Sequence, residues 1–133
     1  MIINKSNICP CGKYRAYKAC CGKIHIHITE AVSAEDLMRS RYSAFTMGMG
    51  IYLNESHCIS TRNELEINNI EKWAKSVKWI RLEILNSTLG TLNDLEGTVE
   101  FKAYFKEGLI NKVIHENSKF IKTDNIWFYH SAL

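Results

Sequence analysis

The chain has 133 residues, 46% of them hydrophobic, with one Pro, seven Gly and a net charge of +3 at pH 7. This composition suits one packed domain with a small appended module and excludes a disordered or low-complexity chain. No apolar stretch approaches the roughly 20 residues that a membrane helix needs. The start of the chain also lacks the apolar region and cleavage site of a signal peptide, so we expect a cytoplasmic protein with no membrane contact.

Four of the five cysteines lie close together near the start of the chain, with the spacing C-x-C-x8-C-C: Cys9, Cys11, Cys20 and Cys21. In a chain without an export signal, such clustering favours a metal site over disulfides. Soft thiolates favour zinc, and four of them fill its coordination shell and leave no position for a catalytic water. We therefore predict one structural Zn²⁺. Two disulfides, a redox dithiol pair and an iron–sulfur site are the alternatives.

Two features near the cysteines bear on this prediction. Residues 1–29 contain no acid, and their basic side chains can offset the negative charge of the thiolates or contact phosphate: Lys5, Lys13, Arg15, Lys18 and Lys23. Either His25 or His27 could replace a cysteine as a ligand. Their spacing in His-Ile-His-Ile also fits an extended segment that packs its isoleucines, and we favour that interpretation.

The cysteine segment resembles a known zinc motif. Cys9-Pro10-Cys11-Gly12 through Cys20-Cys21-Gly22 is similar to the SEC-C motif, named for the zinc-binding tail of the bacterial preprotein translocase ATPase. That motif usually reads C-P-C-G-S-G-K-x-Y/F-K-x-C-C/H, and this chain keeps the cysteine spacing without the usual Ser-Gly. The resemblance implies a docking role, since the translocase motif docks a chaperone partner.

The body of the chain begins with helices. Ser33 can cap a helix whose apolar face is formed by Met38, Tyr42, Phe45 and Met49, with Gly48 and Gly50 at its end. Shorter helices are predicted at 51–55 and 64–77. After residue 77 the pattern alternates, first with Ile80, Leu82 and Ile84 on one face and later over 99–106, 110–122 and 125–130. Helices followed by a four-stranded antiparallel meander predict an α+β domain.

A second resemblance covers almost the whole chain. Leu37-Met38-Arg39-Ser40-Arg41-Tyr42-Ser43-Ala44-Phe45 resembles a signature of the YchJ-like family, in which a SEC-C motif precedes this helix. Further matches are Tyr52, Ser56-His57, the region from Trp73 to Trp79, residues 97–101 and residues 115–120. The resemblance implies an NTF2-like cone of helices against a curved antiparallel sheet. It divides the chain into a zinc knuckle at 1–28 and an NTF2-like domain at 29–133.

Several polar side chains can face the interior of such a cone: Arg39, Arg41, Tyr42, Tyr52, His57, Glu100, His115 and Glu116. Arg41 borders the apolar helix face and could bind a carboxylate or phosphate, although we favour a structural salt bridge to Glu100 or Glu116. His115 could act as an acid or base, although we favour a core histidine. Adjacent strand residues face opposite sides, so His115 and Glu116 cannot line one cavity together.

Two functions follow from these observations. The first is a non-catalytic binding or adaptor protein whose zinc knuckle docks a protein partner, with a nucleic acid or ribosome as a minor alternative. The second is a small enzyme or small-ligand binder that uses Arg41, His57 and His115 in the cone. Cys58 beside His57 lacks the geometry of an activated thiol. One face of the sheet could also be covered by a second copy in a homodimer.

Overall fold

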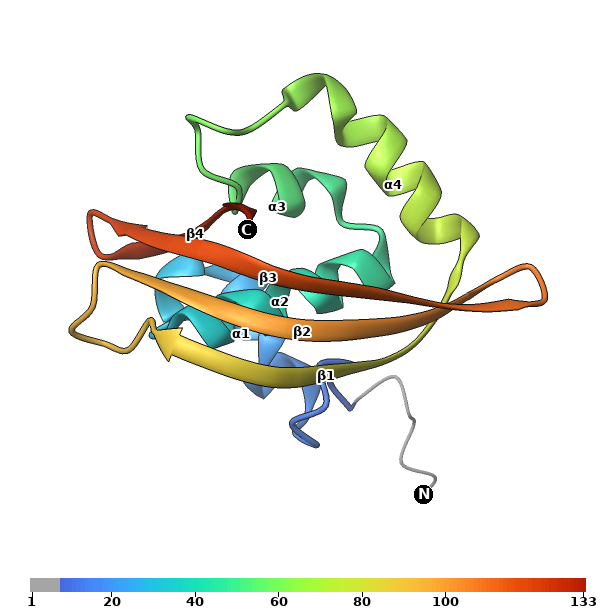
Figure 1. Cartoon of the computed structure of the whole chain (residues 1–133), viewed down its shortest axis with the longest axis horizontal. Helices are drawn as coiled ribbons and strands as arrows, with labels where there is room; N and C mark the ends of the chain where they lie inside the picture. The colour runs from blue at the N-terminus through green and yellow to red at the C-terminus, as the bar shows by residue number, and fades with distance from the viewer. Residues whose placement is uncertain (1–7) are drawn as a thin grey trace.

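The computed structural model describes residues 8–133 and places the helices on one face of a four-stranded sheet (Figure 1). Lys5 and the start of the predicted 1–28 module lie outside the described residues. The N-terminal part contains η2 (Tyr17–Ala19), α1 (Cys21–Ile26) and η3 (Ile28–Glu30). The helical layer consists of α2 (Ala34–Met47), α3 (Gly50–Glu55), η4 (Glu64–Glu66) and α4 (Ile67–Ser76). None of the helices in residues 8–133 has the length and apolar character that crossing a bilayer requires.

Helix α2 has the boundaries that its capping residues predict. The hydroxyl of Ser33 accepts a hydrogen bond from the backbone N–H of Asp36 at 3.0 Å, which satisfies one free donor of the first turn. At the other end Gly48 has φ of 65°, the left-handed conformation that ends many helices. Because α2 is held at both ends, its side chains keep fixed directions toward the cysteine segment and the sheet.

The sheet is an antiparallel meander in the order β1-β2-β3-β4, formed by β1 (Lys78–Leu89), β2 (Glu96–Glu107), β3 (Ile110–Thr123) and β4 (Ile126–Ala132). Strand β2 alternates strictly, and its inward side chains are buried against the helices: Val99, Phe101, Ala103 and Phe105. The predicted α+β architecture, helices first and a curved antiparallel sheet after them, is confirmed.

The curvature of the sheet comes with irregular pairing in β1. The register shifts between Trp79 and Arg81 and again between Ile84 and Asn86, and such bulges bend and twist a strand. The first shift reverses the predicted faces, since Trp79 points toward the helices while Ile80 is 53% exposed. The prediction that Ile80 shares the inward face with Leu82 was therefore wrong, because simple alternation does not hold across a bulge.

The prediction of an extended segment at His25 was also wrong. Residues from Cys21 to Ile26 form helix α1, in which Ile24 is buried and Ile26 is exposed. The helix begins at Cys21, the last cysteine of the cluster. Residues two positions apart lie on different sides of a helix, so Ile24 and Ile26 do not pack together.

Candidate metal centre and cone cavity

The four clustered cysteines come together in a buried cluster at the N-terminal end of α1. Their Sγ atoms all lie within 4.8 Å of one another, and those of Cys11 and Cys20 are 3.6 Å apart. A tetrahedral zinc with Zn–S bonds of about 2.3 Å places its sulfurs about 3.8 Å apart. The donor set and its spacing therefore fit one tetrahedral metal ion.

The electrostatics of the cluster point in the same direction. Hydrogen bonds from Cys11 and Cys21 hold the pKa of the Cys9 thiol far below its usual value, while the same crowding raises the pKa of Cys21. The four sulfurs thus compete for protons at close range. One divalent cation at their centre would stabilise all four as thiolates, which is the form that binds metal.

Helix α2 holds the cysteine cluster in place through several contacts. The guanidinium of Arg39 donates a hydrogen bond of 2.6 Å to the carbonyl oxygen of Cys11 and is paired with Glu35 at 2.9 Å. Lys13 forms an ion pair with Asp36 at 3.2 Å. The charge of Lys13 is therefore paired with an acid of α2 and attaches the knuckle to that helix, a contact that the sequence did not predict.

Neither of the two histidines near the cluster joins the converging sulfurs. His25 Nε2 donates to the carbonyl oxygen of Ser40 at 2.7 Å, so Nδ1 accepts the hydrogen bond from the hydroxyl of Tyr17 at 2.5 Å. With both ring nitrogens occupied, His25 has no lone pair for a metal. His27 is exposed and does not belong to the group of converging donors.

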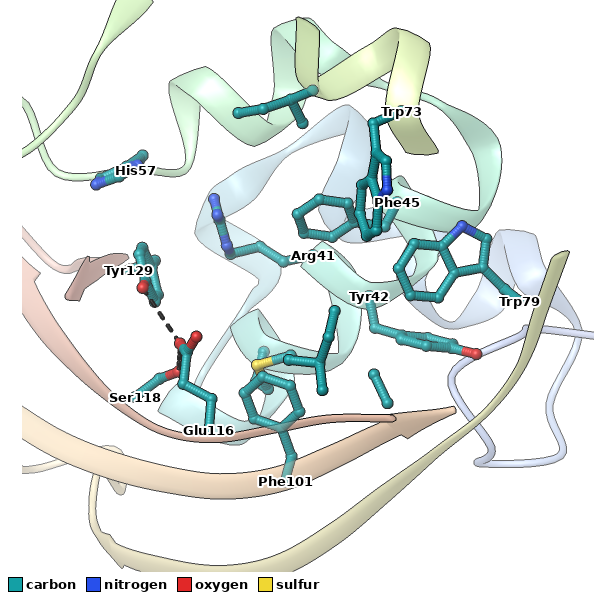
Figure 2. A pocket seen from close by; sticks show the side chains of 14 residues that line it. Arg41, Tyr42, Phe45, His57, Trp73, Trp79, Phe101, Glu116, Ser118 and Tyr129 are labelled. Atoms are coloured by element: carbon teal, nitrogen blue, oxygen red, sulfur yellow. Dashed lines mark hydrogen bonds between the residues drawn. The ribbon is translucent and has the colours of Figure 1, made fainter. Parts of the chain in front are cut away.

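A separate cavity of about 240 Å³ lies between the helices and the sheet (Figure 2). Helix α2 lines it with positions spaced three and four residues apart, which share one helix face. The complete lining is Met38, Arg41, Tyr42, Phe45, His57, Ile70, Trp73, Trp79, Phe101, Ala103, Ile114, Glu116, Ser118 and Tyr129. Most of these side chains are apolar, and the polar ones gather at the end near Tyr129 in Figure 2.

Arg41 is the most buried charged group of the cavity, with 8% of its surface exposed. Its Nη1 donates to the carbonyl oxygen of Leu53 at 2.8 Å and to the hydroxyl of Ser56 at 2.6 Å. Its guanidinium carbon lies 4.6 Å from the centre of the Tyr129 ring. Within residues 8–133 it forms no ion pair with a carboxylate, so the favoured salt bridge to Glu100 or Glu116 is not formed.

Glu116 faces the cavity from β3, where it pairs with Phe101 of β2. Its Oε2 accepts hydrogen bonds from the hydroxyls of Ser118 and Tyr129, the second at 3.2 Å. His115, its neighbour in the strand, lies on the outer face of the sheet and contacts Glu100 at 2.7 Å. The expectation that His115 and Glu116 lie on opposite faces matches their positions, whereas a core position for His115 does not.

The structure divides the predicted pocket residues into two groups. Arg41, Tyr42 and His57 line the cavity. Arg39 instead contacts the knuckle, and buried Tyr52 is hydrogen-bonded to Ser40 at 2.6 Å. Sequence reasoning omitted two polar residues of the cavity, Ser118 and Tyr129. The alternation of β3 could have identified Ser118, because it has the same parity as Glu116.

His57 gives a testable pH dependence. Burial, followed by the cations Arg41 and Arg62, lowers its pKa from 6.5 to about 4. Below pH 6.5 His57 is therefore protonated in the unfolded chain, while in the folded protein it stays neutral down to about pH 4. The free energy of unfolding consequently decreases as the pH falls from 6.5 to 4. We expect His57→Gln to lose about 1 kcal/mol less stability than wild type between pH 7 and pH 5, after allowance for solvent screening.

Urea unfolding of both proteins at the two pH values measures this difference. His25, whose pKa burial also lowers, is present in both proteins and cancels in the comparison. Equal losses in the two proteins would contradict a neutral, desolvated His57.

Comparisons with known proteins agree with this description. A family model described as the middle NTF2-like domain of YchJ matches residues 33–132. A UPF0225 protein of Vibrio vulnificus is 38% identical over 123 residues, which cover 91% of this chain and 71% of that protein. A UPF0225 protein of Chromobacterium violaceum is 40% identical over 126 residues, covering 94% of this chain and 91% of its own length.

Two solved structures share the whole architecture. The solution structure of a SEC-C motif containing protein from Rhodopseudomonas palustris superposes with a TM-score of 0.84 at 30% identity, covering 95% of this chain and 97% of that one. The crystal structure of a SEC-C motif containing protein from Psychrobacter arcticus gives 0.79 at 31% identity, covering 93% and 80%. The likeness therefore includes the cysteine segment as well as the cone.

Proposed function

The chain belongs to the YchJ-like family of UPF0225 proteins, and from that premise we propose that it is a zinc-binding docking protein. In this proposal one structural Zn²⁺ is held by the converging sulfurs of Cys9, Cys11, Cys20 and Cys21. The surface around them docks an acidic segment of a protein partner. The observation that carries the proposal is the exposed, cationic and strained loop between the two cysteine pairs.

The loop presents a single aromatic side chain to solvent. Tyr14 is 89% exposed and has φ of 56°, a left-handed conformation that costs a residue other than glycine about 1 kcal/mol or more. The SEC-C pattern has glycine at this position. A residue that is both strained and without burial contributes little to the fold, which supports a role in contact with a partner.

A groove beside the loop supplies the charge. It is lined by four cations and two acids, namely Lys13, Arg15, Lys23, Arg39, Glu30 and Asp36, together with smaller residues such as Ala19 and Ser33. Lys13 and Arg39 are already paired with acids of α2, whereas Arg15 and Lys23 are exposed. The exposed cations are therefore available to the carboxylates of an acidic peptide.

A protein partner fits this surface better than a nucleic acid. Single-stranded nucleic acids are bound by several aromatic side chains that stack successive bases along a cationic groove. Here Tyr17 is engaged with His25, so Tyr14 is the exposed aromatic of the loop and no row of stacking rings is formed among the described residues of this surface. The enzyme alternative lacks its predicted constellation, since His115 lies outside the cavity that contains Arg41 and His57.

The experiment is a fluorescence-anisotropy titration with a labelled acidic octapeptide and, separately, an RNA octanucleotide. We expect the peptide to bind, and the double variant Arg15→Ala/Lys23→Ala to weaken it tenfold or more at low salt. Lys72→Ala on the exposed face of α4 is the matched control and should change binding less than twofold. Tighter binding of the RNA, or no peptide binding, would refute the proposed docking role.

Tyr14→Gly separates stability from docking. Glycine adopts the left-handed conformation without strain, so the free energy of unfolding should rise by roughly 1 kcal/mol while the metal is retained. Peptide affinity should fall at the same time, because the exposed ring is lost. Chemical unfolding and the peptide titration measure the two effects, and unchanged peptide affinity would show that Tyr14 is not part of the docking surface.

A further inference from the structure

The cone cavity contains two charged groups whose hydrogen-bonding capacity is only partly used. Both hydrogen bonds formed by the Arg41 guanidinium use Nη1, and within the described chain Nε and Nη2 have no partner. Both bonds accepted by Glu116 use Oε2, which leaves Oε1 free among the same residues. Figure 2 shows Arg41 and Glu116 projecting into the same cavity.

These two groups are not neutralised by direct contact. No ion pair within 4.0 Å joins Arg41 to Glu116 among the described residues, although both face one cavity. Among the described residues, the buried side-chain atom that lacks a partner is Nε1 of Trp127, so the free nitrogens of Arg41 are not sealed in but reach the open space of the cavity. They need an acceptor there, which water or a ligand can supply. The free Oε1 of Glu116 in turn needs a hydrogen-bond donor. A ligand that offers one acceptor and one donor would satisfy both groups.

The charge balance of the cavity decides what kind of ligand this is. Arg41 and Glu116 carry opposite charges, and His57 is neutral at pH 7 because its pKa is lowered to about 4. The cavity is therefore neutral overall. An anionic ligand would leave an excess negative charge in a mostly apolar cavity, and a cationic ligand would leave an excess positive charge, so an uncharged ligand is favoured.

The other end of the cavity is aromatic. Trp79 makes ring contacts with Phe45 at 5.8 Å and with Trp73 at 5.6 Å between ring centres, and Figure 2 shows these three rings together on the side opposite His57. These rings already contact one another, so a further ring would pack beside them, against their edges or faces, and not between them. The volume of the cavity limits the size of the ligand. For comparison, an apolar cavity of about 150 Å³ in another protein holds one benzene molecule. A cavity of about 240 Å³ has room for one substituted ring.

We propose that the cavity binds an uncharged, single-ring aromatic molecule with a carboxamide-like group, whose carbonyl accepts from Arg41 and whose N–H donates to Glu116. The ring then lies against Trp73 and Trp79. Such a ligand contacts the free atoms of both groups with adjacent atoms of one planar unit and introduces no new charge. The site is separate from the knuckle, so it does not depend on the docking role proposed above.

The test uses benzamide, benzoate and toluene as probes. Their binding is measured by isothermal titration calorimetry and by the change in fluorescence of the tryptophans in the cavity wall. We expect benzamide to bind wild type at least tenfold more tightly than benzoate or toluene. Glu116→Gln makes the cavity net positive and can still accept from Ser118 and Tyr129. This variant should therefore bind benzoate more tightly than benzamide, which reverses the preference.

A second variant tests the site independently, in case Glu116→Gln does not fold. Ala103→Leu narrows the cavity without changing its charge and should abolish benzamide binding. Benzoate binding to wild type as tightly as benzamide would overturn the proposal, as would a failure of all three probes to bind. The same holds if Ala103→Leu binds benzamide normally, because the ligand would then lie elsewhere.

Discussion

Cys20→Ser is expected to abolish metal binding and to unfold the N-terminal knuckle while the cone stays folded. Wild-type protein purified without chelator should hold close to one zinc per chain, and the variant should hold almost none, because three thiolates no longer close the shell. The loss of a structural metal is among the largest effects of a single substitution, and we expect it to cost the knuckle more than about 4 kcal/mol.

The cone should survive because its buried core lies outside the knuckle, apart from Ile24 of α1. The four cysteines form one buried cluster with Tyr17 packed against it, while Leu37, Val99, Phe120 and Trp127 belong to a different cluster between helices and sheet. Hydrogen exchange would therefore become fast in α1 and remain slow in β2 and β3. The loss of the contacts from Arg39 and Lys13, together with the buried Ile24 side chain, should lower the melting temperature of the cone without unfolding it at room temperature.

Cys58→Ser is the matched control for this experiment. Cys58 is partly exposed, lies outside the cluster and contacts Ser60 at 3.4 Å. This variant should keep its zinc and its melting temperature. Absence of zinc from fresh, reduced wild-type protein would contradict the metal assignment and would turn attention to redox chemistry at the paired cysteines.

The sequence predicted the features that depend on local rules. Cysteine spacing identified the group of converging sulfurs, the cap at Ser33 and the glycine at Gly48 fixed the limits of α2, and alternation placed the strands. The hairpin between β3 and β4 is of the same kind, since Asp124 and Asn125 both have positive φ in a two-residue turn. Each of these features follows from residues that are close in sequence.

The features that were mispredicted depend on contacts between distant residues. Arg39 and Arg41 are two positions apart on α2, so a helical wheel places them on opposite sides. It cannot tell that the knuckle covers the side of Arg39. The bulge at Ile80 reverses which residues of β1 face the helices, and the sequence has no glycine or proline there to indicate it. His115 was predicted to be a core residue, whereas its pairing with Lys102 places it on the outer face of the sheet.

Gly97→Ala is expected to destabilise the whole cone and to weaken both candidate sites. A Cβ at Gly97 would lie 2.4 Å from the Cα and 2.5 Å from the backbone nitrogen of Gly90. Two backbones meet there, so no side chain can move aside. We expect a loss of about 3 kcal/mol in the free energy of unfolding, at the upper end of the range for overpacking.

The effect on the sites follows from what Gly90 holds. Its carbonyl oxygen accepts a hydrogen bond of 2.9 Å from the backbone N–H of Ala34, the first residue of α2. Displacement of Gly90 therefore shifts the helix that carries Arg39 to the knuckle and Arg41 to the cavity. Gly97→Ala should consequently lower zinc retention and benzamide affinity together, although Gly97 belongs to neither site.

Gly108→Ala provides the comparison that isolates the steric cause. Gly108 has φ of +62°, and a Cβ there would meet nothing within 4 Å, so the cost is conformational strain of about 1 kcal/mol. This variant should leave zinc content and benzamide affinity unchanged. If Gly97→Ala costs no more than Gly108→Ala, or if neither site responds to it, the two sites are not coupled through the start of α2. A joint loss in Gly97→Ala alone would show that one helix sets the geometry of both.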